Sequence, residues 1–321
     1  MRVLITGAAG YIGQNLLSDL AVQHLDWNLI AADVRALPGH NLKPNVEPVR
    51  MDLSHPKQVM DCVRNYRPDA IVHLAAVINP PRSMSPVLLH TIEVGGSRTL
   101  IEAAGECGVG QLIVTSSGAA YGYHPENAEW IDEADPLRGH QQFLYARHKH
   151  EIEELLAKAR QTYPQMRQLV LRPGTILGRG AHNPITDLFK RRSVLGISGR
   201  CSRFVFIWDQ DVVNIIRQGL ERNSEGIFNL AGDGALSMRE IAEILGKPYR
   251  PYPALVMRGA LAVLKPLGLS QYGPEQVDFI RYRPVLANRR LKEEFGYQPR
   301  YSSREAFLAF LAARGIKPGQ R

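Results

Sequence analysis

Tyr145 and Lys149 lie four residues apart in a segment with a helical pattern, Tyr145-Ala-Arg-His-Lys149. Residues at this spacing lie one turn apart on the same face of a helix, so the Lys149 ammonium would sit beside the Tyr145 phenol. A free phenol titrates at about 10 and is a weak base at neutral pH unless a cation stabilises its anion. The pair therefore suits the removal of a proton from a substrate hydroxyl.

A second group of hydroxyl side chains lies in T-S-S-G-A-A-Y-G, residues 115–122, directly after the apolar run at 112–114. Parallel α/β sheets bind ligands at the carboxyl ends of their strands, so this loop should border the reacting part of a bound ligand. Ser117 can donate a hydrogen bond to a substrate oxygen while Tyr145 removes or returns the proton. For Ser116 we favour a role in capping backbone groups.

The chain begins with an apolar run, Val3–Ile5, that leads into glycines at 7, 10 and 13 and then into a helical pattern. A run without a polar face is typical of a central parallel strand covered on both sides. Gly7 would permit a tight turn, Gly10 would let backbone N–H groups approach a pyrophosphate, and Gly13 would let the helix pack closely on the strand. This context predicts a dinucleotide-binding unit.

A second apolar run, Asn28–Asp33, ends in a carboxylate 20 residues after Gly13. At this position a carboxylate accepts hydrogen bonds from the ribose hydroxyls of the adenosine. Because the 2′-phosphate of NADP would meet a like charge, Asp33 favours NAD as the cofactor. Arg35 lies two residues on and can offset part of this preference.

Short apolar runs and helical patterns alternate up to residue 171, which predicts an α/β fold with a doubly wound parallel sheet of the Rossmann type. Further strands are expected at 46–51, 70–74, 112–115 and 169–171, and helices near 55–65, 85–105 and 141–163. Beyond Pro173 the elements become shorter, with helices near 183–193, 211–221 and 237–245 and a strand at 203–208. We predict an NAD-binding domain at 1–172 and a smaller, interleaved substrate-binding region at 173–321, with segments that return to the sheet.

The composition excludes several classes of protein. The chain has 321 residues, 45% of them hydrophobic, and no apolar stretch of the roughly 20 residues that span a membrane. The first apolar residues fit a strand, so we expect no secretion signal. Cys62, Cys107 and Cys201 share no metal or redox spacing, which favours a protein of the reducing cytoplasm without a metal.

The charge is distributed unevenly along the chain. Residues 1–171 carry 15 Lys and Arg against 18 Asp and Glu, a net −3, whereas residues 172–321 carry 24 against 13, a net +11. A positive second half suits an anionic small-molecule substrate such as a diphosphate or carboxylate, although a solvated basic surface explains it equally well. No basic cluster is interleaved with aromatic residues, so we expect no nucleic-acid partner.

Taken together, these motifs resemble the extended short-chain dehydrogenase/reductases and, more narrowly, the NAD-dependent epimerase/dehydratase family. The resemblance extends to about residue 305 and includes H-L-A-A at 73–76 and R-P-G-T-I-L-G at 172–178. It implies that Ser117, Tyr145 and Lys149 are catalytic and that the chain forms a homodimer through the helices near 85–105 and 141–163. The cofactor contacts that it implies are Gly7, Gly10, Tyr11, Ile12, Gly13, Asp33, Asp52, Leu53, Leu74, Ala75, Ala76, Tyr145, Lys149 and Pro173.

Five positions depart from the pattern that the resemblance implies. Glu93 and Thr175 stand where family members often carry Asn, and Trp208 replaces a frequent His. The Asp-Glu pair of the 4,6-dehydratases is absent after Ser117, where Gly118 and Ala119 stand, so dehydration is not expected. The predicted substrate contacts are Ser117, Thr175, Arg179, Arg203 and Trp208.

The sequence thus predicts an NAD-dependent oxidoreductase that removes a hydride from a secondary alcohol with Tyr145 as the base. Epimerisation of a sugar nucleotide or related phosphorylated sugar is slightly favoured over simple dehydrogenation of another alcohol. A protein that senses NAD without turnover is a remote alternative. The apolar segment 255–269 is too short to span a bilayer and would pack on the substrate region or a second subunit, cover a nonpolar substrate, or contact a membrane surface.

Overall fold

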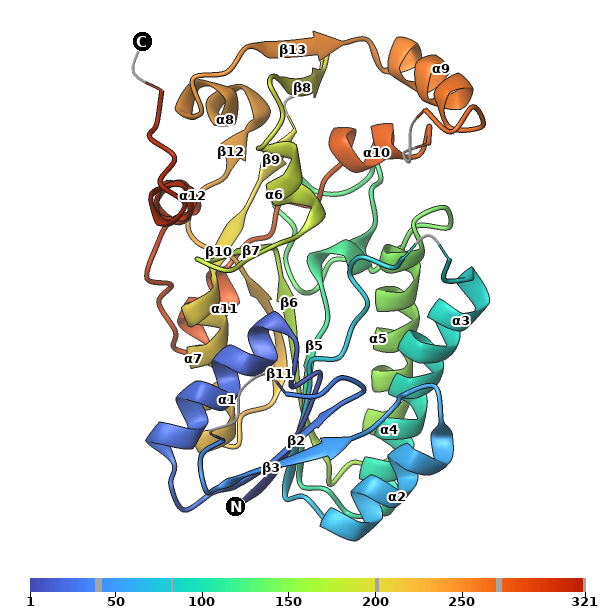
Figure 1. The fold of residues 1–321 in the computed structure, drawn as a ribbon, viewed down its shortest axis with the longest axis vertical. Helices are drawn as coiled ribbons and strands as arrows, with labels where there is room; N and C mark the ends of the chain where they lie inside the picture. The colour runs from blue at the N-terminus through green and yellow to red at the C-terminus, as the bar shows by residue number, and fades with distance from the viewer. Residues whose placement is uncertain (38–41, 82, 200–201, 270–272, 320–321) are drawn as a thin grey trace.

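A seven-stranded parallel sheet forms the centre of the molecule in a computed structural model that describes residues 1–37, 42–81, 83–199, 202–269 and 273–319 (Figure 1). The strand order is β11-β6-β5-β4-β1-β2-β3, and every neighbouring pair is parallel. The strands are β1 (Arg2–Thr6), β2 (Asn28–Asp33), β3 (Val46–Arg50), β4 (Ala70–His73), β5 (Gln111–Thr115), β6 (Arg167–Pro173) and β11 (Gly226–Leu230). The predicted α/β fold is confirmed.

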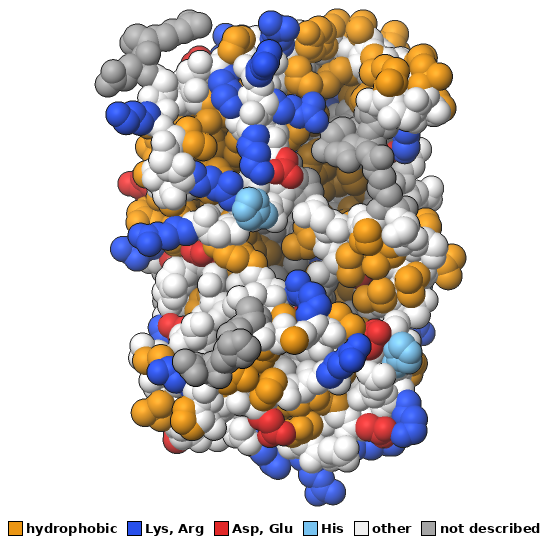
Figure 2. Space-filling view, viewed as in Figure 1, with side chains coloured by type: hydrophobic (Ala, Val, Ile, Leu, Met, Phe, Trp, Pro, Cys, Tyr) orange, Lys and Arg blue, Asp and Glu red, His pale blue; other side chains and the backbone are white. Residues whose placement is uncertain are grey.

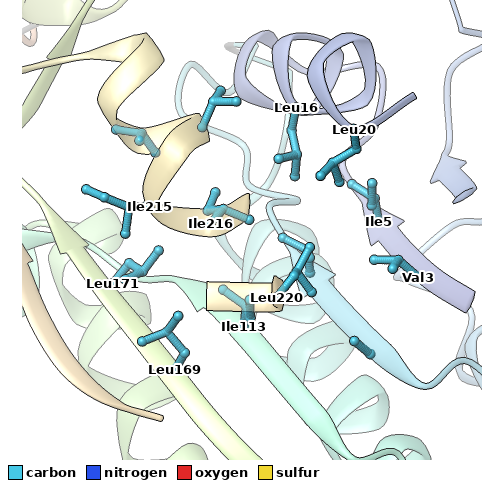
Figure 3. Close-up of a cluster of buried hydrophobic side chains, with 14 of the residues drawn as sticks. Val3, Ile5, Leu16, Leu20, Ile113, Leu169, Leu171, Ile215, Ile216 and Leu220 are labelled. Atoms are coloured by element: carbon cyan, nitrogen blue, oxygen red, sulfur yellow. The ribbon is translucent and has the colours of Figure 1, made fainter. Parts of the chain in front are cut away.

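Helices cover both faces of this sheet (Figure 1). One face packs against α1 (Tyr11–Gln23) and α7 (Asp209–Glu221). The other packs against α2 (Pro56–Tyr66), α4 (Gly96–Glu106) and α5 (Leu144–Thr162). Figure 3 shows the first of these cores, where side chains of the two helices meet those of the sheet; the labelled residues include Leu16, Leu20, Ile113, Leu169, Ile215 and Ile216.

The segment expected as one helix at 85–105 consists of three parts. They are α3 (Pro86–His90), a π-helical turn at Thr91–Gly95, and α4. Such turns are rare and occur often at functional sites. This turn carries Glu93, which is 4% exposed.

The second half of the chain contains shorter elements than the sequence predicted. The expected helix at 183–193 ends early, as α6 (Pro184–Leu188), and is followed by β8 (Val194–Ile197). The expected strand at 203–208 is divided into β9 (Arg203–Phe204) and β10 (Phe206–Trp208). The division arises because β9 pairs with β12 whereas β10 pairs with β7, so the chain changes partners at Val205.

These elements form a separate layer at the upper end of Figure 1, around a core that includes Phe204, Phe206 and Phe307. Its further elements are β7 (Thr175–Leu177), β12 (Leu236–Ser237), α8 (Met238–Ile244), β13 (Tyr249–Tyr252), α9 (Ala254–Leu264), α10 (Gln276–Arg281) and α12 (Ser303–Ala313), whereas α11 (Arg289–Glu293) packs beside β11 on the sheet. Although α7 and β11 lie beyond residue 172, they belong to the sheet and its covering layer. The boundary at residue 172 stays a prediction. Within the described ranges, no helix has the length and apolar character needed to cross a membrane.

We expect Gly13→Ala to lower the free energy of unfolding by about 1–3 kcal/mol, the usual cost of overpacking a tight site. The added Cβ would lie 2.2 Å from the Gly7 carbonyl oxygen and 2.8 Å from the Ala8 Cα. Chemical denaturation monitored by circular dichroism measures this change. The matched control is Gly259→Ala on α9, where nothing lies within 4 Å of the added Cβ and the helix should be unchanged or slightly more stable. Equal stability of the two variants would contradict the close packing of α1 on the loop.

Candidate active site

The predicted ligand-binding residues form a row along the carboxyl edge of the sheet. Strand order alone produces this row, because parallel strands all end at the same edge. In order across the sheet, the row contains Pro173 on β6, Ser117 after β5, Leu74, Ala75 and Ala76 after β4, Gly7 to Gly13 after β1, Asp33 on β2, and Asp52 and Leu53 after β3. The chain reverses its direction of winding between β4 and β1, which is where such folds bind dinucleotides.

The glycine loop leaves no room for side chains. Gly7 has a φ of +71°, and a Cβ there would lie 2.6 Å from the backbone nitrogen of Ala75. A Cβ on Gly10 would lie 2.9 Å from the Gly7 carbonyl oxygen. No side chain caps the start of α1, and its first turn holds no acidic residue. The loop and the positive end of the helix dipole therefore fit the close approach of an anionic group.

Asp33 connects the end of β2 to this loop. Its Oδ2 accepts a hydrogen bond of 3.0 Å from the Ala9 N–H, and its Oδ1 accepts hydrogen bonds from the Arg35 backbone N–H and Nε at 2.9 and 3.3 Å. The Arg35 side chain is 64% exposed. The carboxylate is thus held beside the loop, with the cation that can offset its charge in direct contact.

Other predicted cofactor contacts lie along the same edge. Although burial raises the pKa of Asp52, hydrogen bonds from Ser54 outweigh it and hold that pKa below its ordinary value. Leu53 lies against Gly96, whose Cβ would come within 2.6 Å of the Leu53 Cβ. The Leu74 N–H donates to the Thr6 carbonyl at 3.1 Å, which fixes the start of the Leu74–Ala76 segment beside β1.

Tyr11 joins the glycine loop to the second layer. Its hydroxyl donates to the Asp209 carboxylate at the start of α7 and accepts a hydrogen bond of 3.3 Å from the Gly180 N–H. A Cβ on Gly178 would lie 2.3 Å from the Tyr11 hydroxyl oxygen. The side chain therefore contacts both the 178–180 loop and α7.

Tyr145, Ser117 and Lys149 lie together at the carboxyl end of β5. The Ser117 side chain lies within reach of the Tyr145 phenol and lowers its pKa. Lys149 Nζ lies 5.7 Å from the centre of the Tyr145 ring and donates to the Thr115 carbonyl at 3.3 Å. The helix α5, which begins at Leu144, thus presents both residues toward the loop that carries Ser117.

Burial shifts the pKa values of Tyr145 and Lys149. It raises the pKa of Tyr145 to about 12, with the Ser117 side chain lowering that pKa and the Glu93 carboxylate raising it. Burial also lowers the pKa of Lys149, while Glu93 and Glu153 raise it. The phenol is therefore protonated at neutral pH and needs further positive charge nearby to act as a base.

Glu93 lies beneath the pair, in the π-helical turn. Its carboxylate accepts hydrogen bonds from the Val77 N–H at 2.7 Å and from His148 Nδ1 at 3.1 Å. Burial raises the pKa of Glu93, but the hydrogen bond from His148, the Lys149 charge and the Val77 N–H outweigh it and lower that pKa. The sequence marked this residue only as a departure from the family pattern, whereas the structure places it in the electrostatic surroundings of both Tyr145 and Lys149.

A buried ion pair holds the serine loop in place. Arg172 on β6 donates to both carboxylate oxygens of Glu153 on α5, with Nη2 2.6 Å from Oε2 and Nε 2.8 Å from Oε1. Ser116 Oγ donates to the same carboxylate at 2.6 Å, and Arg172 Nη1 donates to the Tyr121 hydroxyl at 2.8 Å. Ser116 is therefore a structural anchor, and the backbone-capping role expected for it was wrong, because it is Ser117 whose Oγ accepts a hydrogen bond of 3.1 Å from the Ala119 N–H.

Arg283 is a candidate substrate residue that the sequence analysis missed. Its Nη2 donates to Thr175 Oγ1 at 2.7 Å, and its guanidinium lies 4.5 Å and 4.9 Å from the ring centres of Phe204 and Phe279. Among the described residues it forms no ion pair. Burial lowers the pKa of Arg283, and Tyr123 raises it.

Aromatic rings connect Arg283 to the catalytic pair. Tyr123 interacts electrostatically with both Arg283 and Tyr145. Its ring lies 5.1 Å from Phe143 and 5.0 Å from Phe279, and the last two rings are stacked at 5.5 Å. The three rings form an aromatic wall, and Phe143 lies two residues before Tyr145.

The structure places the other predicted substrate residues differently. Thr175 lies in the site through its bond to Arg283, but Arg203 pairs with Glu129 at 2.7 Å and lies over the Trp130 ring. Arg179 is exposed on the 178–180 loop. The Trp208 ring packs edge to face on Tyr301, in the core of the second layer.

A sequence signal for Arg283 did exist. Residues 279–292 contain five Lys and Arg and no acidic residue. That pattern alone fits a solvated basic surface just as well as a substrate-binding site. No group of three or more His, Cys, Asp or Glu within the described ranges is placed to hold a metal ion.

A model of the NAD dependent epimerase/dehydratase family matches residues 3–231, most of the chain and all seven strands of the sheet except for the first residue of β1. The chain belongs to this family. Family membership makes the protein an NAD-dependent enzyme. The glycine loop, the uncapped start of α1 and the Asp33 carboxylate provide the space and the hydrogen-bonding groups that this cofactor requires.

Proteins similar to this chain include an epimerase, an uncharacterized protein and a dehydrogenase. The chain is 26% identical to the UDP-glucose 4-epimerase of Thermus thermophilus, solved in complex with NAD, with a TM-score of 0.74 over 98% of this chain and 99% of that chain. It is 25% identical to the uncharacterized protein Rv0501 of Mycobacterium tuberculosis over 98% of this chain and 85% of that protein. It is 26% identical to the decarboxylating sterol-4-alpha-carboxylate 3-dehydrogenase of Saccharomyces cerevisiae over 58% of this chain and 54% of that protein.

For this family member we expect NAD to bind more tightly than NADP, and we expect Asp33→Ser to narrow the ratio of the two dissociation constants. The substitution removes the carboxylate that would repel the 2′-phosphate and leaves Arg35 beside it. Fluorescence titration of both reduced cofactors measures the ratio. Asp61→Ser, which removes an exposed carboxylate on α2, is the control. An unchanged ratio in Asp33→Ser would place the discrimination elsewhere.

Proposed function

We propose that this enzyme oxidises a secondary alcohol with Tyr145 as the base. The observation that carries the proposal is the contact of Tyr145 with Ser117 at the carboxyl end of β5, with Lys149 one helical turn away. A substrate hydroxyl placed between these two side chains would accept a hydrogen bond from Ser117 and donate one to the Tyr145 oxygen. This arrangement meets the geometric requirement for proton transfer.

In the proposed step the alcohol loses a proton and a hydride and becomes a ketone. The cofactor, when bound, supplies the hydride acceptor. Tyr145 takes the hydroxyl proton, and the Lys149 ammonium stabilises the phenolate that results. Because burial raises the pKa of Tyr145 to about 12 in the unliganded chain, the base depends on positive charge that reaches it in the assembled site.

Arg283 supports an anionic substrate. A guanidinium without a carboxylate partner can hold a phosphate or carboxylate with two parallel hydrogen bonds. We therefore favour a sugar nucleotide or related phosphorylated sugar, whose ketone is reduced again on the other face, so that the net reaction is epimerisation. The likeness to a UDP-glucose 4-epimerase supports this choice.

A simple dehydrogenase acting on another alcohol is the second candidate. The aromatic wall of Tyr123, Phe143 and Phe279 favours it, because these rings offer an apolar surface to a substrate. The substrate in the name of one relative, a sterol carboxylate, combines an apolar body with an anion. A protein that senses NAD without turnover would leave the Ser117–Tyr145 contact without a purpose.

A panel of alcohols, incubated with the enzyme and NAD, distinguishes the two candidates. Absorbance of the reduced nicotinamide follows net oxidation, and the stereochemistry of the product follows inversion. Inversion without net reduction of the cofactor supports the epimerase. Accumulation of reduced cofactor with a ketone supports the dehydrogenase, and turnover of no member of either class would count against both.

Tyr145→Phe should lower turnover by at least about a hundredfold, because it removes the proton acceptor. The affinity for NAD should stay nearly unchanged, because the substitution leaves the backbone contacts of the glycine loop in place. Steady-state kinetics and cofactor titration measure the two quantities. Tyr66→Phe is the matched control, because that hydroxyl contacts only Glu47 at the surface. Activity of Tyr145→Phe within tenfold of the wild type would remove Tyr145 from the mechanism.

Arg283→Met should raise the Michaelis constant for the substrate by about tenfold to a thousandfold, with a smaller effect on kcat, because a charge-assisted contact to an anion is lost. Arg203→Met and Arg179→Met should act in the same direction. The Arg203 effect should be smaller, because Glu129 already neutralises that guanidinium. The control is Arg64→Met on α2. If all three variants bind and turn over substrate normally, the substrate is not held as an anion here.

A further inference from the structure

Helix α9 and the turn after it present apolar side chains to the outside of the molecule. Leu255, Val263, Leu267 and Leu269 are 83%, 59%, 64% and 72% exposed. None of the eleven residues of α9 is fully buried. Figure 2 shows this surface as a group of hydrophobic side chains at the upper right, over α9. So large an exposed apolar surface marks an interaction site.

The helix lacks the polar outer face of an ordinary surface helix. Its partly buried residues, Ala254, Met257, Arg258 and Leu261, lie on one stripe with helical spacing, and this stripe includes the only charged residue of α9. Arg258 pairs with Asp278 on the neighbouring α10. A surface helix normally turns its charges to water and its apolar residues inward. In α9 both sides are apolar: Met257 and Leu261 face the protein beside Arg258, and Leu255 and Val263 face outward.

Positive charge lies at the same end of the molecule as this apolar surface. The segments 187–198 and 249–281, which form this end of the molecule, contain seven Lys and Arg against three Asp and Glu. The three acidic residues are Asp187, Glu275 and Asp278, and each pairs with a Lys or Arg. Arg192 and Arg250 are exposed. Lys and Arg side chains lie along the same upper end in Figure 2.

These features favour a membrane surface over a second copy of the chain. In a two-fold contact each copy would bring the same positive surplus to the interface, so the charges would repel. Anionic lipid headgroups complement that charge, and acyl chains accept the apolar side chains. The helix stands at a corner of the molecule rather than in a recess (Figure 1), and at eleven residues it is too short to span a bilayer. The homodimer predicted from the sequence would use α4 and α5, which cover the sheet instead.

The same surface is connected to the catalytic pair. Helix α10 contacts α9 and carries Phe279, which stacks on Phe143 two residues before Tyr145. Helix α10 and these rings therefore link the exposed apolar surface to the segment that carries Tyr145. A protein docked by α9 would hold its substrate site close to the membrane surface.

We propose that α9 and the turn 265–269 dock this protein on the surface of a membrane that contains anionic lipids. Leu255, Val263, Leu267 and Leu269 enter the boundary between headgroups and acyl chains, and the Lys and Arg side chains at this end contact the headgroups. The docking does not require that Tyr145 be the base, so it can be tested independently of the proposed function.

Flotation of the full chain with lipid vesicles tests this proposal. The wild type should float with vesicles of phosphatidylcholine and phosphatidylglycerol, and less with phosphatidylcholine alone or at high salt. The double variant Leu255→Ser with Leu267→Ser should lower the bound fraction by about tenfold or more. Arg192→Glu with Arg250→Glu should remove the preference for phosphatidylglycerol.

The matched control is Val22→Ser with Leu25→Ser, which replaces two exposed apolar residues beside the end of α1, 56% and 74% exposed, far from α9. It should float like the wild type. Circular dichroism and NADH titration should show that all variants are folded. The proposal is wrong if the wild type binds neither kind of vesicle, or if the control loses as much binding as the α9 variant. It is also wrong if light scattering shows a wild-type dimer that the α9 substitutions convert to a monomer, because the apolar face would then belong to a second copy.

Discussion

The ion pair between Glu153 and Arg172 is the interaction on which the rest of the site depends. Both side chains are 4% exposed, and an unpaired charge at such a depth costs about 3–5 kcal/mol. Tyr145, Lys149 and Glu153 follow one another at intervals of four on α5, so a single helix face carries the proposed base, the cation and the anchor. The ion pair fixes how that face is turned toward β5 and β6. Any rotation of α5 that moved Tyr145 would also separate two buried charges.

The same hydrogen-bond network extends to the edge of the sheet. Arg172 bonds the Tyr121 hydroxyl, which in turn donates to Asn229 Oδ1 on the edge strand β11 at 2.9 Å. The Asn229 N–H donates to Glu133 Oε1 at 2.6 Å. The loop that carries Ser117 is thus bonded to an edge strand more than 100 residues later. Here the apolar core gives stability, and the polar network gives the loop one defined position.

Sequence reasoning succeeded where local pattern and topology agree. The strand before the glycines, the helix after them and the spacing of Tyr145 and Lys149 each have a period that a sequence displays, and parallel topology then places them on one edge. It failed where long-range partners decide the structure. The strand at 203–208 divides because two different strands pair with its halves, and Arg283 reaches the site only because a distant segment folds over Thr175.

The apolar segment 255–269 shows a different limit. An apolar run with little polar periodicity usually indicates a buried helix, and nothing in the residues themselves tells which face is covered. Only the ion pair from Arg258 to Asp278 shows that the charged stripe faces the protein. Glu93 was visible in the sequence only as an unusual residue. Its proximity to Tyr145 and Lys149 depends on the π-helical turn, which the sequence did not reveal.

The contact of Tyr11 with Asp209 and the Gly180 N–H limits how the two layers can move. Tyr11 follows Gly10 directly, so the segment expected to hold the pyrophosphate is bonded to the inner end of the second layer. That layer cannot separate from the sheet at this end without breaking those bonds. A movement of this layer that kept the Tyr11 bonds would displace the opposite end, where α9 and α10 lie, the most.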